Sequence, residues 1–115
     1  MTVTIFHNPR CSKSRETLAL LEAKGIAPKV VRYLETPPSA GELRDVLQKL
    51  GLTPRQLMRR KEAQYEELGL DDESLSDDAL IEAMVAHPVL IERPIVLANG
   101  KAAIGRPPES VLGIL

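Results

Sequence analysis

Cysteine, histidine and aromatic residues are scarce in this sequence, and each shortage excludes a class of site. One cysteine among 115 residues excludes an internal disulfide and a cysteine-rich metal site, as is usual in a reducing cytosol. The two histidines, His7 and His87, are too far apart for metal-ligand spacing, so we expect no metal. With no Trp, one Phe and two Tyr, the chain lacks stacking platforms for single-stranded nucleic acid. No apolar run approaches a membrane span and no signal peptide is recognisable, so we expect a cytoplasmic protein with no membrane partner.

The charge is nearly balanced overall but unevenly distributed. The formal net charge is −1, and residues 62–82 contain nine acids and no base. Such a run is usually a solvated face. A basic face long enough to follow a nucleic acid is absent from the sequence, so we expect no nucleic-acid partner. The length is sufficient for one core, and we expect a single domain over residues 1–115.

The first third of the sequence predicts a βαβ unit. Residues 2–6 are β-branched and alternating, which is typical of a strand. A helix is predicted from about Lys13 to Gly25, a residue suited to a helix C-terminus, and residues 29–34 predict a second strand. A connection this short predicts a parallel strand pair with a right-handed crossover.

Capping signals and one hairpin signal predict the rest of the fold. Ser39, Thr53 and Ser76 each precede a predicted helix, and Asn99-Gly100 predicts a tight turn between strands at residues 94–98 and 101–105. A last helix is predicted from Pro107. The order β-α-β-α-α-α-β-β-α is similar to a thioredoxin-like layout. We therefore predict an α/β fold with a four-stranded mixed sheet flanked by helices, and a helical insertion between the βαβ half and the ββα half.

Residues 7–15 connect the first predicted strand to the first predicted helix and contain the only cysteine, Cys11. The first backbone N–H groups of a helix lack intrahelical partners, and the helix dipole places partial positive charge there. A thiol at this point has a lowered pKa, and the same N–H groups can bind a tetrahedral oxyanion. We interpret Cys11 as a reactive nucleophile, against the alternative of a buried, inert residue. His7 either polarises the thiol or ends the strand.

Five motifs are spread along the chain. They are His7-Asn8-Pro9-x-Cys11-x-x-Ser14-Arg15, Tyr33-Leu34-Glu35-Thr36-Pro37-Pro38, Leu57-Met58-Arg59, His87-Pro88-Val89-Leu90-Ile91-Glu92-Arg93-Pro94-Ile95-Val96 and Gly105-Arg106-Pro107. In this order the motifs resemble the glutaredoxin-coupled arsenate reductase family, which has a thioredoxin-like fold. The resemblance extends from Thr2 to Leu115.

The resemblance implies a mechanism and a set of site residues. Cys11 would attack the arsenic of arsenate, and His7 and Ser14 would lower the pKa of its thiol by charge and by hydrogen bonding. Three arginines would bind the oxyanion, and a cis proline would face the cysteine; these residues are Arg59, Arg93, Arg106 and Pro94. Glutathione, as co-substrate, would displace arsenite and form a mixed disulfide with Cys11, which glutaredoxin would reduce. No bound cofactor is implied, and the biological role would be arsenic resistance.

Two features of the sequence fit this chemistry independently of the resemblance. Arginine is always protonated, and its planar guanidinium can bind two oxygens of an anion at once, unlike lysine. Because the chain has no second cysteine, no intramolecular disulfide can resolve an intermediate formed on Cys11. An external thiol is therefore required.

Alternatives remain for the arginines and for the function. Arg59 has Arg60 and Lys61 beside it, and any of the three could point inward or pair with the acidic segment. Arg93 could form a surface ion pair, and Arg106 could be an ordinary exposed residue. One alternative function is a glutathione-linked thiol oxidoreductase acting on another substrate. Another is a regulator of the same fold that docks on RNA polymerase, but those proteins typically carry Cys-x-x-Cys, where this chain has Ser14.

Overall fold

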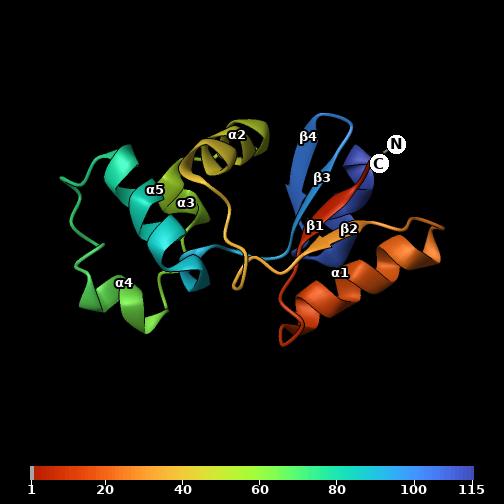
Figure 1. Ribbon diagram of the computed structural model, residues 1–115, viewed down its shortest axis with the longest axis horizontal. Helices are drawn as coiled ribbons and strands as arrows, with labels where there is room; N and C mark the ends of the chain where they lie inside the picture. The colour runs from red at the N-terminus through yellow and green to blue at the C-terminus, as the bar shows by residue number, and fades with distance from the viewer. Residues whose placement is uncertain (1) are drawn as a thin grey trace. The chain divides into compact units, whose positions relative to one another are not determined.

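A computed structural model describes residues 2–115 (Figure 1). The described chain forms two compact units. One unit consists of the segments up to Thr36 and from Arg93 onward, and the other is Pro37–Glu92. The second unit corresponds to the predicted helical insertion, while the expectation of a single domain over residues 1–115 stays a prediction. Within residues 2–115, no helix is both long and apolar enough to cross a membrane.

The first unit is built on a four-stranded mixed sheet with the strand order β2-β1-β3-β4. Its strands are β1 (Thr4–Phe6), β2 (Lys29–Val31), β3 (Ile95–Ala98) and β4 (Lys101–Ile104). β1 pairs with β2 in parallel and with β3 in antiparallel orientation, and β3 and β4 form the predicted hairpin. Asn99 and Gly100 both have positive φ in the turn, as a two-residue hairpin turn requires. The predicted mixed sheet is confirmed.

Helix α1 (Ser12–Ala23) and the 3-10 helix η2 (Pro108–Ile114) pack together and against the sheet. The core between them contains apolar side chains from all three parts. These are Val3, Ile5, Leu21, Val96, Ala98 and Val111, each no more than 4% exposed. α1 is therefore anchored by its buried face, and the loop of residues 7–11 joins it to the end of β1.

Two elements of this unit differ from the prediction. β2 ends at Val31 rather than at residue 34, because the Arg32 carbonyl accepts the backbone N–H groups of Glu35 and Thr36 at 2.9 Å and forms a turn there. The predicted last helix is a 3-10 helix of seven residues, which is longer than the three or four residues usual for this tighter helix.

The second unit contains the helices α2 (Ala40–Leu50), α3 (Pro54–Leu57), α4 (Ala63–Glu67) and α5 (Asp77–Ala86), and the 3-10 helix η1 (Pro88–Leu90). α5 packs against α2, α3 and η1. The predicted capping boxes at Ser39 and Thr53 are both present, and the Ser76 hydroxyl caps α5 as predicted. An isolated β-bridge joins Met58 to Ile91 within this unit.

Candidate functional site

The loop between β1 and α1 is held by backbone hydrogen bonds at both ends. The His7 N–H donates to the Val31 carbonyl at 2.8 Å, which continues the pairing of β1 with β2. The Asn8 carbonyl accepts the Cys11 N–H at 3.0 Å, and the Asn8 Oδ1 accepts the Arg10 N–H at 3.0 Å. These contacts close a tight turn, and Cys11 is the residue that precedes the first turn of α1.

Cys11 therefore occupies the predicted position at a helix N-terminus, and the residue is 8% exposed. Burial on its own raises the pKa of the Cys11 thiol. The backbone N–H groups of Ser14 and Lys13 and the charges of Arg93 and Arg106 oppose this effect, and the net result is a pKa below the ordinary value. The thiolate is the nucleophilic form of cysteine. The environment thus favours the reactive interpretation of Cys11 over the inert one.

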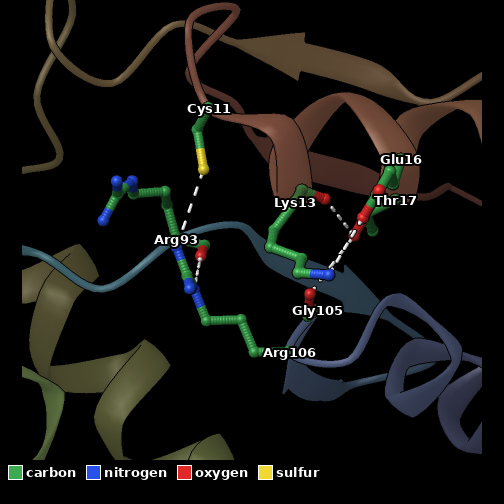
Figure 2. Close-up of polar contacts among 7 residues, drawn as sticks. All are labelled: Cys11, Lys13, Glu16, Thr17, Arg93, Gly105 and Arg106. Carbon is green, nitrogen blue, oxygen red and sulfur yellow. Dashed lines mark hydrogen bonds and ion pairs between the residues drawn. The ribbon is translucent and has the colours of Figure 1, made fainter.

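Arg106 contacts the Cys11 sulfur directly. Its Nη2 donates to Cys11 Sγ at 3.6 Å, and its Nε donates to the Arg93 carbonyl at 2.7 Å. Figure 2 shows the Cys11 sulfur pointing toward the two arginines. The guanidinium makes both contacts at once because its nitrogens are fixed in one plane. The structure thus brings Arg106 to Cys11 from a position 95 residues away in the sequence.

Arg93 and Pro94 lie at the start of β3, and their peptide bond is cis. The Arg93 side chain is half-buried, and its charge lowers the pKa of the Cys11 thiol. The peptide bond between Arg106 and Pro107 is also cis, a feature that the sequence does not predict. Both arginines that act on Cys11 therefore precede a cis proline.

His7 and Ser14 form a buried pair next to the nucleophile. His7 Nδ1 lies 2.7 Å from Ser14 Oγ, and Ser14 Oγ also accepts the Asn8 N–H at 3.0 Å. His7 is 6% exposed and Ser14 is fully buried. Because Oγ already accepts one hydrogen, we assign its own hydrogen to Nδ1, with the proton of the neutral imidazole on Nε2.

The surroundings of His7 bear on the charge that the family resemblance implies for it. Burial lowers the pKa of His7 below its ordinary value of 6.5, and the nearby cations Arg32 and Arg15 lower it further. The neutral imidazole is therefore favoured at neutral pH, and an effect of His7 charge on Cys11 stays a prediction. His7 contacts the Ser14 hydroxyl, while the Ser14 backbone N–H lowers the pKa of the Cys11 thiol.

The lowered pKa of His7 predicts a pH dependence of stability. The unfolded chain binds a proton at His7 more readily than the native chain, so the native state loses stability as pH falls below about 6.5 toward the lower native pKa. Urea unfolding of the wild type should show this decline between about pH 7.5 and about pH 5.5. The decline should be smaller in His7→Asn, whereas His87→Asn, which replaces the other histidine, should retain it. An undiminished decline in His7→Asn would contradict the assignment.

Arg59 lies in the second unit, and it is less exposed than its two basic neighbours, Arg60 and Lys61. Its backbone N–H donates to the Leu90 carbonyl at 2.7 Å. Its guanidinium forms an ion pair with Glu62, and its Nε lies 3.8 Å from an oxygen of Glu92. The Arg59 side chain is 24% exposed, while Arg60 and Lys61 are both exposed. Arg59 is thus the least exposed of the three, and it pairs with Glu62, the first acid of the acidic segment. Its binding of an oxyanion stays a prediction.

Comparison with known proteins identifies the family. The model of the ArsC family matches residues 6–114. The chain belongs to the ArsC family. It is 64% identical over 114 residues to the protein of Escherichia coli K12 named "Uncharacterized protein YfgD", which covers 98% of this chain and 96% of that protein. It is 59% identical over 114 residues to an arsenate reductase from Neisseria meningitidis serogroup A, which covers 98% of this chain and 97% of that protein.

Solved structures agree with this family membership. An arsenate reductase from Vibrio cholerae has a TM-score of 0.97 at 64% identity, covering 100% of this chain and 98% of that chain. A Bacteroides fragilis protein shares the fold alone, at 19% identity and a TM-score of 0.79. That match covers 90% of this chain and 91% of the other. The predicted thioredoxin-like α/β fold of this ArsC-family chain is confirmed.

Three residues support the site of this ArsC-family chain in ways that the sequence did not predict, although Asn8 and Gly105 stand within its motifs. Asn8 closes the loop before Cys11 through its backbone and its side chain. The Asn8-Pro9 dipeptide is a turn signal that could have identified it. Thr17 and Gly105 lie against each other beside the two arginines. No local signal marks that contact, because the two residues are 88 positions apart.

Proposed function

We propose that this chain reduces arsenate to arsenite, with Cys11 as the nucleophile and with glutathione and glutaredoxin as the reducing system. The observation that carries the proposal is the setting of the Cys11 sulfur. It lies at a helix N-terminus with a lowered pKa and accepts a hydrogen bond from Arg106. Membership of the ArsC family and the names of the Neisseria meningitidis and Vibrio cholerae proteins support arsenate as the substrate.

In the first proposed step, the Cys11 thiolate attacks the arsenic atom of arsenate. A sulfur–arsenic bond forms, and one arsenate oxygen leaves as water after it is protonated. Cationic guanidinium groups and helix N-terminal N–H groups stabilise the negative charge on the remaining oxygens. Arg93 and Arg106 are the residues proposed for this task beside Cys11, and the family resemblance implies oxyanion binding by Arg59 as well.

In the second proposed step, the thiolate of glutathione attacks the Cys11 sulfur. The sulfur–arsenic bond breaks, and its electron pair stays on arsenic, which leaves as arsenite in the trivalent state. The two electrons come from one Cys11 thiol and one glutathione thiol, which end as a mixed disulfide. Glutaredoxin then removes the glutathione by thiol–disulfide exchange. The absence of a second cysteine from the sequence supports this use of an external thiol.

A coupled assay tests the proposal. NADPH oxidation is followed in the presence of glutathione reductase, glutathione and glutaredoxin, with and without arsenate. We expect oxidation that requires arsenate, glutathione and glutaredoxin together. If Cys11 reacts with glutathione disulfide but no turnover depends on arsenate, the chain is instead a glutathione-linked thiol oxidoreductase acting on another substrate. Arsenic resistance and a cytoplasmic location belong to the same proposal, and sensitivity of a deletion strain to arsenate tests the former.

Arg59→Lys and its neighbour Arg60→Lys form a matched pair that tests the third arginine. Lysine keeps the charge but loses the planar guanidinium that can bind two oxygens at once. We expect Arg59→Lys to lower kcat/KM for arsenate by about tenfold. Arg60 is exposed, and Arg60→Lys is expected to retain wild-type kinetics. Equal kinetics in the two variants would remove Arg59 from the proposed site.

A further inference from the structure

Arg106 follows Gly105, and the surroundings of Gly105 are the tightest of any glycine in the chain. A Cβ atom built on Gly105 would lie 2.4 Å from Thr17 Oγ1, 2.8 Å from Pro94 Cγ and 3.0 Å from Thr17 Cγ2. At the other six glycines, an added Cβ would meet nothing within 4 Å. Gly105 also lacks a positive φ, so the position requires glycine for space and not for backbone conformation.

Two contacts hold the Gly105 backbone in this position, and a third holds Thr17, the residue it packs against. Its N–H donates to the Pro94 carbonyl at 3.0 Å, which joins it to the start of β3. Thr17 is fully buried, and its hydroxyl donates to the Lys13 carbonyl at 2.8 Å within α1. The same oxygen lies 3.4 Å from the Gly105 carbonyl oxygen. Figure 2 shows Thr17 and Gly105 facing each other next to Arg106.

The position of this contact connects it to the nucleophile. Cys11 is the N-cap residue of α1, and Thr17 lies within that helix, six residues later. α1 therefore carries both the Cys11 sulfur and Thr17. Gly105, the residue before Arg106, packs against Thr17. Active-site side chains keep their geometry when residues behind them are locked by packing.

We propose that Thr17 and Gly105 form a clamp that sets the distance between the Arg106 guanidinium and the Cys11 sulfur. Thr17 and Gly105 are thus positioning residues that act through Arg106. The clamp deepens the proposed function, because it specifies what holds one of the groups that bind the oxyanion. Its effect on the thiol can be measured without arsenate.

Gly105→Ala tests the clamp, with Gly113→Ala as the matched control. The added methyl group at residue 105 must displace the loop, whereas at Gly113 it meets open space. The midpoint of the pH profile for alkylation of Cys11 by iodoacetamide should rise in Gly105→Ala, because Arg106 moves away from the sulfur. In the coupled assay, kcat/KM for arsenate should fall by about tenfold or more. Gly113→Ala should match the wild type in both measurements.

Two further variants separate positioning from a general effect on structure. Thr17→Ala combined with Gly105→Ala removes two of the three close contacts and leaves only that with Pro94 Cγ. In this double variant, the alkylation midpoint and kcat/KM should both return part of the way to their wild-type values. In an Arg106→Ala background, Gly105→Ala should produce no further rise in the alkylation midpoint, since the group through which the clamp acts is absent.

The outcomes distinguish the clamp from the proposed function. An unchanged alkylation profile in Gly105→Ala, or an equal rise with and without Arg106, overturns the clamp. If Gly105→Ala does not fold, Thr17→Ala alone makes the test, because it removes packing against Gly105 without a clash and should raise the midpoint in the same direction. A chain that shows the expected midpoints but no arsenate-dependent turnover retains the clamp and refutes the reductase.

Discussion

Cys11→Ser is expected to lower arsenate-dependent turnover by about a thousandfold or more, because a serine hydroxyl does not ionise at neutral pH and is a far weaker nucleophile. The environment of Cys11 lowers the pKa of a thiol, but the same shift leaves a hydroxyl protonated. This is the largest effect that the account predicts. It is measured in the coupled assay with glutathione and glutaredoxin.

The same Cys11→Ser variant should lose turnover without losing stability. The Cys11 side chain forms no capping hydrogen bond to α1, whereas serine is among the preferred residues at that position. The free energy of unfolding should therefore stay the same or rise by up to about 1 kcal/mol in Cys11→Ser. Ser12→Ala is the control, since Ser12 is the exposed neighbour and its replacement should retain turnover. Turnover retained by Cys11→Ser would refute the mechanism.

Arg106→Lys should have the second-largest effect, a fall in kcat/KM for arsenate of about tenfold to a hundredfold. Arg106 donates from Nε to the Arg93 carbonyl and from Nη2 to Cys11 Sγ at the same time. A lysine ammonium is a single point of charge on a flexible stem. It cannot reproduce both contacts with the geometry of a planar guanidinium, although the formal charge is kept.

Arg106→Ala extends this test to the thiol itself. The charge of Arg106 is one of the causes of the lowered pKa of Cys11, so its removal should raise the midpoint of the alkylation profile. Arg60→Lys is the control for both measurements. Wild-type kinetics in Arg106→Lys together with an unchanged midpoint in Arg106→Ala would remove Arg106 from the site.

The elements predicted best from the sequence are those specified by local contacts. The capping boxes at Ser39 and Thr53 involve residues three positions apart, so a short stretch of sequence contains all the interacting groups. The hairpin at Asn99-Gly100 is local in the same sense. The position of Cys11 at the start of α1 followed from the change between a strand pattern and a helical one.

The contacts that shape the site could not be predicted in this way. Arg106 reaches the Cys11 sulfur across 95 residues, and Thr17 meets Gly105 across 88. These segments come together because β3 pairs with β1 as well as with β4. The lowered pKa of His7 depends on burial and on two arginines, Arg32 and Arg15, of which Arg32 lies outside the His7 motif. The motifs therefore predicted Cys11 and Arg106 as site residues but not the geometry between them.

Intact mass spectrometry of the protein after incubation with arsenate and glutathione, without glutaredoxin, tests the central claim most directly. The account predicts that one glutathione is bound per chain on Cys11, and that it accumulates because glutaredoxin is absent. Phosphate in place of arsenate can occupy an oxyanion site but offers no route to reduction, so no adduct should form. No adduct with arsenate, or an equal adduct with phosphate, would contradict the account.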